Sequence, residues 1–363
     1  MSALYYRPVY FLIVSILTLI VGARYNDEYI EDNRLKSNVA QTLFGGLLAL
    51  FMIIFIGLRP VSGIYFVDMW NYRANYMTFN YGEAFEFTWE TDNFIFDNLM
   101  AWFGSMQIEI EVIFFIVAVI YFGCMYLACR KLFPNDVFLS FLVYLGAFST
   151  FAYGTNGIKA GAAASIFLVA IAYKDRKIIA LLFLFLSLGF HHSMLVPVVA
   201  FIITYFIRNP RLYLVLWLIC LFFAAIHVTY FMDFFSGFTD EHGAGYLIEE
   251  IENAEENVSG FRPDFILYSA IPIFLGFYYM QSNKIESDIY KFIWCTYTLT
   301  NCVFLLCTYG HFINRIAYLS WLMLPIVLIY PALSKNWDNE EPRHFKFIVF
   351  CHLGFTLFMN FIY

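Results

Sequence analysis

Residues 156–195 read NGIKAGAAASIFLVAIAYKDRKIIALLFLFLSLGFHHSML, two apolar runs separated by a short basic segment. Runs of this kind predict helices in a membrane. Lys159 stands at the start of the first run, and the adjacent His191 and His192 stand at the end of the second. An ionisable group in or beside hydrocarbon costs on the order of 3 kcal/mol, so it usually marks a polar pathway or a bound polar ligand.

The composition of the whole chain extends this interpretation. Of the 363 residues, 61% are hydrophobic and 13% are charged, whereas a soluble domain carries about 25% charged residues. The sequence therefore predicts an all-α polytopic membrane protein with about twelve transmembrane helices, some of them short or re-entrant. No linker divides the chain, so residues 1–363 are expected to form a single transmembrane domain. The apolar runs are 8–22, 40–58, 109–130, 137–152, 158–173, 178–190, 194–207, 211–231, 264–280, 289–308, 312–333 and 345–362.

The basic residues predict the orientation. Most of the 21 Lys and Arg residues fall in alternate loops, which the positive-inside rule places in the cytoplasm, with both chain ends outside. Two long loops, 59–108 and 232–263, then face outward, and long loops in compact proteins are often functional. Residues 92–106 predict a short amphipathic helix on the outer surface. The basic loops are 23–39, 130–136, 174–177, 208–211, 281–291 and 334–346.

The sequence argues against several classes of protein. A formal charge of −7 with only short basic clusters does not favour a nucleic-acid partner. The chain contains no G-x-x-x-x-G-K-[ST], no G-x-G-x-x-G, no H-E-x-x-H and no D-x-D pair, and its seven cysteines lie inside apolar runs. We therefore expect neither a metal site nor a cofactor.

The segment 178–207 is expected to form a hairpin, since this keeps the basic residues at both of its ends in the cytoplasm. Its first arm of about 13 residues spans only about 20 Å, less than the hydrocarbon core. The tip, Phe190–Ser193, should then be recessed below the outer surface and line a water-filled cavity.

Two basic side chains are candidates for binding an anion. Lys159 follows the turn Gly154–Gly157 and opens a helix of small residues that predicts close packing. Arg315 lies near the start of the run 312–333, and its guanidinium is able to clamp phosphate with two hydrogen bonds. The competing interpretations are a lysine that reaches the lipid headgroups and an arginine that anchors its helix at the interface.

Two further residues are candidates for proton transfer. His191 is able to act as a general base, because imidazole exchanges its proton near neutral pH. Asp68, flanked by apolar residues, is able to orient or deprotonate a sugar hydroxyl. The alternatives are a histidine satisfied in the core or at a helix end, and a loop ion pair between Asp68 and Arg73.

Four short motifs follow one another in a fixed order: Asp68…Tyr72, Gly157-Ile158-Lys159, Phe190-His191-His192-Ser193 and Arg315-Ile316-Ala317-Tyr318. Together they resemble the EpsG/Wzy-type polysaccharide polymerases. Those proteins carry Gly-x-Asp-x-x-x-Tyr in the first outer loop, an Arg-Gln-x-x-Ala helix, a Phe-His-x-Ser turn and a late Arg before aromatic residues. The chain departs from this pattern where Lys159-Ala160 replaces Arg-Gln and where Val67 precedes the aspartate.

The resemblance implies a GT-C-like transmembrane glycosyltransferase at the outer, periplasmic face of a bacterial inner membrane. Such an enzyme joins oligosaccharide repeat units carried on undecaprenyl diphosphate, without metal or nucleotide. Its expected partners are the lipid-linked donor and acceptor, membrane lipid and a chain-length regulator.

The resemblance also implies roles for particular residues. A hydroxyl of one lipid-linked unit attacks the anomeric carbon of another, and undecaprenyl diphosphate leaves. His191 or Asp68 would be the base, and cations near the outer surface would stabilise the leaving group. The residues expected to bind the diphosphate or substrate are Lys159, Arg315, Arg73, His192, Tyr72 and His311.

Three other functions remain open from the sequence. A flippase for the same lipid-linked sugars would also have many helices and buried cations, although the hairpin has no counterpart in the other half of the chain, as repeat-built transporters require. A membrane acyltransferase would use His191 to activate a sugar hydroxyl. An O-antigen ligase shares the donor but uses a different acceptor.

Overall fold

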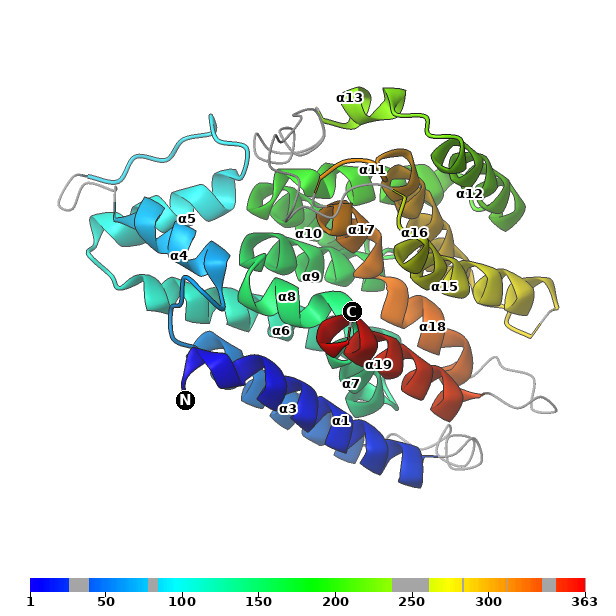
Figure 1. Cartoon of the computed structure of the whole chain (residues 1–363), viewed down its shortest axis with the longest axis horizontal. Coiled ribbons are helices and arrows are strands. Elements are labelled where there is room, and N and C mark those ends of the chain that lie inside the picture. The colour runs from blue at the N-terminus through cyan, green and yellow to red at the C-terminus, as the bar shows by residue number, and fades with distance from the viewer. Residues whose placement is uncertain are drawn as a thin grey trace. The chain divides into compact units, whose positions relative to one another are not determined.

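The structure, a computed structural model, describes residues 1–25, 39–77, 84–236, 261–282, 284–311, 313–334 and 344–362. Over these residues the chain is all-helical and contains no β-strand (Figure 1). The predicted all-α class is therefore confirmed. Most of the acidic outer loop 232–263 lies outside the described residues.

The contacts divide the chain into two compact units. Unit 1 comprises Met1–His191 with Pro342–Tyr363, and unit 2 comprises His192–Glu341. The predicted single transmembrane domain stays a prediction, and each unit is described by itself.

Unit 1 is built around α9, which packs against α6, α8 and α10 (Figure 1). All residues of α9 except Lys159 and Ala160 are buried. Residues 160–165 near its start, AGAAAS, are all small, and small residues allow neighbouring backbones to approach closely in a membrane protein. The helices are α1 (Tyr6–Arg24), α3 (Val39–Gly57), α4 (Val67–Tyr76), α5 (Phe94–Ser105), α6 (Ile110–Leu132), α7 (Val137–Leu145), α8 (Phe148–Thr155), α9 (Ile158–Ala172), α10 (Lys177–Phe190) and α19 (Phe345–Phe361).

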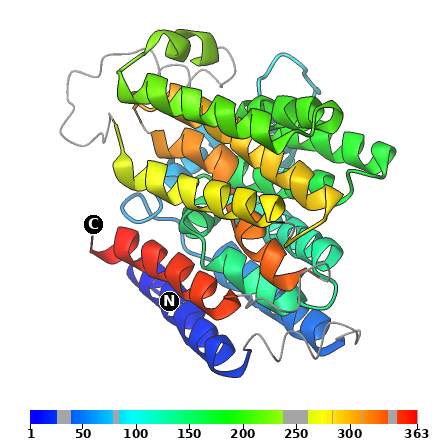
Figure 2. The same ribbon diagram turned by 90° about the vertical axis from the view of Figure 1, so that its right-hand side faces the viewer.

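The two ends of the chain meet in unit 1. Helix α19 packs beside α1 (Figure 2). Arg7 near the start of α1 donates a hydrogen bond to the side-chain oxygen of Asn360 at 2.9 Å. The C-terminal helix thus belongs to the same unit as the N-terminal one.

Unit 2 is built around α16, which packs against α11, α12, α15, α17 and α18. Asn301 of α16 is fully buried and links three helices: it accepts a hydrogen bond from the indole of Trp217 (2.8 Å) and donates one to the hydroxyl of Ser320 (2.9 Å). The elements are η2 (His192–Met194), α11 (Leu195–Phe206), α12 (Pro210–Ala225), α13 (Tyr230–Ser236), α15 (Pro263–Gln281), α16 (Asp288–Leu306), α17 (Ile313–Trp321) and α18 (Leu324–Leu333).

Three predicted helices are interrupted. The run 137–152 forms α7 and α8, bent by 76°. The hydroxyl of Thr150 bonds to the carbonyl oxygen of Tyr144 (2.6 Å) at this break and satisfies an acceptor at the end of α7. Pro325 at the start of α18 lacks an amide hydrogen, which explains the break after α17. Helix α12 ends at Ala225 and the chain turns by 115° into α13.

The predicted break between the arms of 178–207 is present. Helix α10 ends at Phe190, and a new segment begins with η2 at His192. The predicted surface helix 92–106 is also present, as α5. The boundary between the two units falls inside 178–207. The hairpin arrangement and its recessed tip therefore stay predictions.

The predicted number of spans is not confirmed. Five described helices are long and apolar enough to cross a membrane, or up to seven if each bent pair forms one span. Several other predicted spans, such as α9 and α10, are shorter apolar helices. The chain is a multi-pass membrane protein by this criterion, and the GT-C-like architecture remains a proposal.

Candidate functional site

Lys159 and His191 lie at the same end of the packed pair α9–α10. The two helices are joined by a short connection, and the hydroxyl of Ser187 in α10 donates a hydrogen bond to the carbonyl oxygen of Ala163 in α9, 2.8 Å away. Lys159 lies four residues before Ala163, and His191 lies four residues after Ser187. Each is therefore about one helical turn, or about 6 Å, beyond this hydrogen bond. Both side chains are half-buried.

The turn before Lys159 is held tightly. The amide of Gly157 bonds to the carbonyl oxygen of Ala152 (3.1 Å), and the amide of Gly161 bonds to that of Gly157 (2.8 Å). A Cβ placed on Gly161 would lie 2.6 Å from the carbonyl oxygen of Tyr153. Only glycine fits here without a shift of backbone, so the start of α9 is fixed against the end of α8.

Helix α5 places the predicted Asp68…Tyr72 motif near the end of α10. The ring of Phe96 contacts both Tyr72 on α4 (centroids 5.6 Å apart) and Phe190 on α10 (6.4 Å). Each contact is edge-to-face, the arrangement that aromatic pairs favour. Phe190 directly precedes His191, so this aromatic series connects α4 to the histidine. Unit 1 thus brings Lys159, His191 and the α4 motif to one end.

Helix α4 presents Asp68 and Tyr72 on one side, because residues four apart share a helical face. Asp68 is half-buried and lies in the first turn, where a carboxylate interacts favourably with the helix dipole. Arg73 forms an ion pair with Glu111 at the start of α6, with 3.8 Å between nitrogen and oxygen. Both side chains are more than 40% exposed, so this pair stabilises little. The sequence suggested Asp68 as the alternative partner of Arg73, whereas the ion pair that the structure shows for Arg73 is with Glu111.

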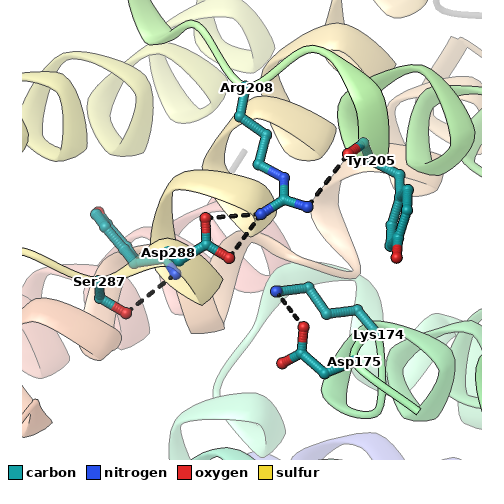
Figure 3. A network of polar contacts seen from close by, with 7 residues as sticks. Lys174, Asp175, Tyr205, Arg208, Ser287 and Asp288 are labelled. Carbon is teal, nitrogen blue, oxygen red and sulfur yellow. Dashed lines mark hydrogen bonds and ion pairs between the residues drawn. The ribbon is translucent and has the colours of Figure 1, made fainter. Parts of the chain in front are cut away.

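The other predicted residues, His192, His311 and Arg315, belong to unit 2. Arg208, two residues after the end of α11, pairs with Asp288 at the start of α16, with 2.7 Å between the charged atoms (Figure 3). The end of α11 therefore lies beside the start of α16. His192 begins the segment that leads into α11, and Arg315 follows the far end of α16, so both lie toward the other end of unit 2.

The environments of these unit 2 residues differ. Arg315 is exposed, whereas His311 is partly buried and its Nδ1 is buried without a hydrogen-bond partner. His311 follows Tyr309, whose hydroxyl donates to the carbonyl oxygen of Ala224 (2.7 Å) and whose ring lies 3.8 Å from that of His227. The structure thus places an additional histidine, His227, beside the turn that leads to Arg315.

The described basic residues of the predicted cytoplasmic loops gather at the opposite ends. In unit 2, Arg211 bonds to Gln281 (3.1 Å) near the Arg208–Asp288 pair. In unit 1, Lys174 pairs with Asp175 (2.7 Å) at the end of α9 away from Lys159 (Figure 3). Each unit therefore has a basic end and an end that carries candidate site residues.

The sequence analysis did not single out Arg59. Arg59 lies two residues after the end of α3 and is buried, with 3% of its surface exposed. The sequence contained a signal for Arg59, because a single arginine at the end of an apolar run is as unusual as a lysine at the start of one. The sequence analysis counted Arg59 only among the basic residues on the outer side of the membrane.

The described residues contain no group of three or more His, Cys, Asp or Glu side chains arranged to hold a metal ion. This finding does not test the prediction that the reaction needs no metal.

The comparisons with known proteins decide the family. The model of the EpsG family matches residues 42–363. The chain belongs to the EpsG family. No curated protein and no solved structure matches it. Membership confirms the resemblance inferred from the four short motifs, all of which lie within the matched region. It supports a membrane protein of the polysaccharide-polymerase type, and the EpsG match includes Arg59 and both sets of candidate residues.

Proposed function

We propose that this EpsG-family protein is a membrane glycosyltransferase that joins undecaprenyl-diphosphate-linked oligosaccharide repeat units at the outer face of a bacterial inner membrane. The observation that carries the proposal is the placement of Lys159 and His191 at one end of the α9–α10 pair. The aromatic series from Phe190 brings Asp68 and Tyr72 to the same end. A cation, a base and a carboxylate are thus supplied by three helices of one unit.

The reaction forms one glycosidic bond and breaks one bond to phosphate. A hydroxyl oxygen of the acceptor sugar attacks the anomeric carbon of the donor, and its proton passes to His191 or Asp68. The bond between the anomeric carbon and the diphosphate oxygen breaks, and undecaprenyl diphosphate leaves with its electron pair. The proposal requires no redox partner and no nucleotide.

The leaving group is anionic, so cations are expected in the site. Negative charge develops on the diphosphate as its bond to the sugar breaks, and a fixed cation stabilises that charge more than it stabilises the ground state. Lys159 is our first assignment for this role in unit 1, and Arg315 is our assignment in unit 2. Arg73 is a weaker candidate, because it already pairs with Glu111.

The remaining residues are assigned to substrate binding. Tyr72, His192 and His311 carry groups that hydrogen-bond to sugar hydroxyls or phosphate oxygens. Holding two long lipid-linked substrates in register lowers the entropic part of the barrier. A chain-length regulator is a further expected partner, and the periplasmic side is the expected side of catalysis.

The deciding experiment compares surface polysaccharide from cells with and without the gene. The proposal predicts that the ladder of long polymers collapses to a single repeat unit on its lipid carrier or core. Loss of the single-repeat product outside, with lipid-linked units retained inside, would instead identify a flippase. A normal ladder whose polymer is no longer attached to its final acceptor would identify a ligase. Chains of normal length that lack acyl groups would identify an acyltransferase, and an unchanged polysaccharide would refute the assigned substrate.

A further inference from the structure

Arg59 connects two segments that are far apart in sequence. Its Nη1 donates to the carbonyl oxygen of Ile56 (2.7 Å) in the last turn of α3. Its Nη2 donates to the carbonyl oxygen of Thr155 (2.9 Å), the last residue of α8. Thr155 begins the tight turn that leads to Lys159. One planar guanidinium thus joins the end of α3 to the turn that carries the lysine.

The same guanidinium also contacts the segment that carries Asp68. Its central carbon lies 5.7 Å from the centre of the Phe66 ring and 5.9 Å from that of Phe114. Both distances fall within the range of cation–π attraction. Phe66 is buried, 1% exposed, and is the residue directly before α4. Asp68 follows two residues later, so Arg59 lies between the two candidate segments of unit 1.

This arrangement is electrostatically unfavourable for the fold. No carboxylate among the described residues forms an ion pair with Arg59, and its Nε is buried without a hydrogen-bond partner. Burial lowers the pKa of the Arg59 guanidinium to about 9, although the nearby Tyr6 opposes the shift. The group nevertheless remains protonated at neutral pH. A buried charge without a counter-charge destabilises a protein.

Arg262 of unit 2 offers a comparison. It is nearly as buried, at 8% exposed, and its guanidinium also contacts an aromatic ring, that of Phe265 at 4.0 Å. Unlike Arg59, it pairs with a carboxylate, that of Asp264. Arg262 is therefore a buried arginine with a carboxylate partner, whereas Arg59 has no such partner among the described residues.

We propose that Arg59 is a positioning residue that holds the turn before Lys159 in register with the beginning of α4, where Asp68 lies. Its donors reach backbone carbonyl oxygens, so its effect on the reaction passes through Lys159 and Asp68. The importance of that effect rests on the proposed function, whereas the positioning itself does not. The register of the two segments is tested without any glycan.

The test uses two variants of the purified full chain in detergent. Arg59→Met fills a similar volume but removes the charge and both hydrogen bonds, whereas Arg59→Lys keeps the charge and is able to make one of the two bonds. Amide hydrogen exchange, read by mass spectrometry, reports local opening of the backbone. Arg262→Met is the matched control in the other unit.

The expected result is local. In Arg59→Met, exchange should increase by about tenfold in peptides covering 155–161 and 66–70, while other peptides of unit 1 keep their rates. Arg59→Lys should give a smaller increase in the same peptides. The midpoint of thermal unfolding should change little in Arg59→Met, since removal of an unpaired buried charge offsets the loss of two hydrogen-bond donors. Arg262→Met should leave both segments unchanged.

Two results would overturn the proposal. Unchanged exchange at both segments would show that Arg59 does not hold them, and a uniform increase with a lower unfolding midpoint would show a residue that only stabilises the fold. The polysaccharide ladder separates this from the proposed function. Local opening in Arg59→Met, with a normal ladder in cells lacking the gene, leaves the positioning intact and refutes the polymerase. A lost ladder in Arg59→Met with unchanged exchange refutes the positioning instead.

Discussion

Ser187 and Ala163 set the register between α9 and α10, because the hydroxyl of one bonds to the carbonyl oxygen of the other at 2.8 Å deep in unit 1. Both residues are fully buried, so this polar contact distinguishes one alignment of the two helices from its neighbours. That alignment determines the positions of Lys159 and His191 relative to each other along the helix axes.

Ser187→Ala should therefore reduce polymer formation more than it reduces stability. Interhelical hydrogen bonds in membranes contribute about 0.6 kcal/mol, so unfolding should shift only slightly. Turnover should fall several-fold, because a small displacement of Lys159 against His191 misaligns the reacting groups. Ser165→Ala is the control, since the shortest bond of Ser165 is to Ala162 within its own helix (2.8 Å). Equal losses of turnover in both variants would contradict the prediction.

Lys159→Ala and Arg315→Ala should each abolish long polymer while the protein level in the membrane stays normal. Loss of one charge that stabilises the leaving group lowers a rate by about 10²–10³. Lys159→Arg should be tolerated, because a cation is retained. The ladder and an immunoblot are measured together, and normal ladders in both alanine variants would refute the diphosphate assignment.

Gly161→Ala should destabilise unit 1 and lower activity. The added methyl group meets the carbonyl oxygen of Tyr153, so the backbone must move, at about 1–3 kcal/mol. Gly123→Ala in α6 provides the opposite expectation, because nothing lies within 4 Å of its added Cβ and alanine favours a helix by about 0.5–1 kcal/mol. Thermal unfolding in detergent should shift downward for the first variant and upward for the second.

Tyr72→Phe separates packing from substrate binding. The ring contact with Phe96 is kept, so the variant should fold as the parent does. If the hydroxyl binds the substrate, KM should rise several-fold in Tyr72→Phe with little change in stability. Tyr72→Ala also removes the ring, so it should lose both substrate binding and the packing against Phe96. A wild-type KM in Tyr72→Phe would limit Tyr72 to packing.

Asn301→Leu should destabilise unit 2 strongly. It leaves the buried indole N–H of Trp217 without an acceptor, at about 1–3 kcal/mol. The hydroxyl of Ser320 loses the donor Asn301 but keeps its own bond to the carbonyl oxygen of Ala317. Thr300→Val tests the neighbouring position, whose hydroxyl bonds only within α16 (2.8 Å to Thr296). A similar loss of stability in both variants would show that the link between helices is not what Asn301 contributes.

The sequence predicted those features that depend on local patterns. The apolar runs predicted the helices, and the basic residues at both ends of 178–207 predicted the break after α10. The segment 92–106 predicted α5, because its apolar residues recur at helical spacing. Lys159 and His191 were identified because a charged residue beside hydrocarbon is conspicuous in any sequence.

Features that depend on distant contacts were not predicted. Helix α4 was not expected, since its sequence, VDMWNYRANY, has no strong apolar stripe. The structure instead anchors it by the burial of Phe66, Met69 and Tyr76. The hydrogen bond from Arg59 to the carbonyl oxygen of Thr155 joins residues that are far apart in sequence, so no local pattern predicts it.

Lys159 stands in the first turn of α9, at the helix end where the backbone dipole already concentrates positive charge. A cation at this position interacts unfavourably with the dipole of its own helix. An anionic lipid headgroup bound at this end would reduce that repulsion and raise the unfolding midpoint as its concentration increases. The unliganded protein should therefore unfold at a lower temperature than the protein with an anion bound near Lys159.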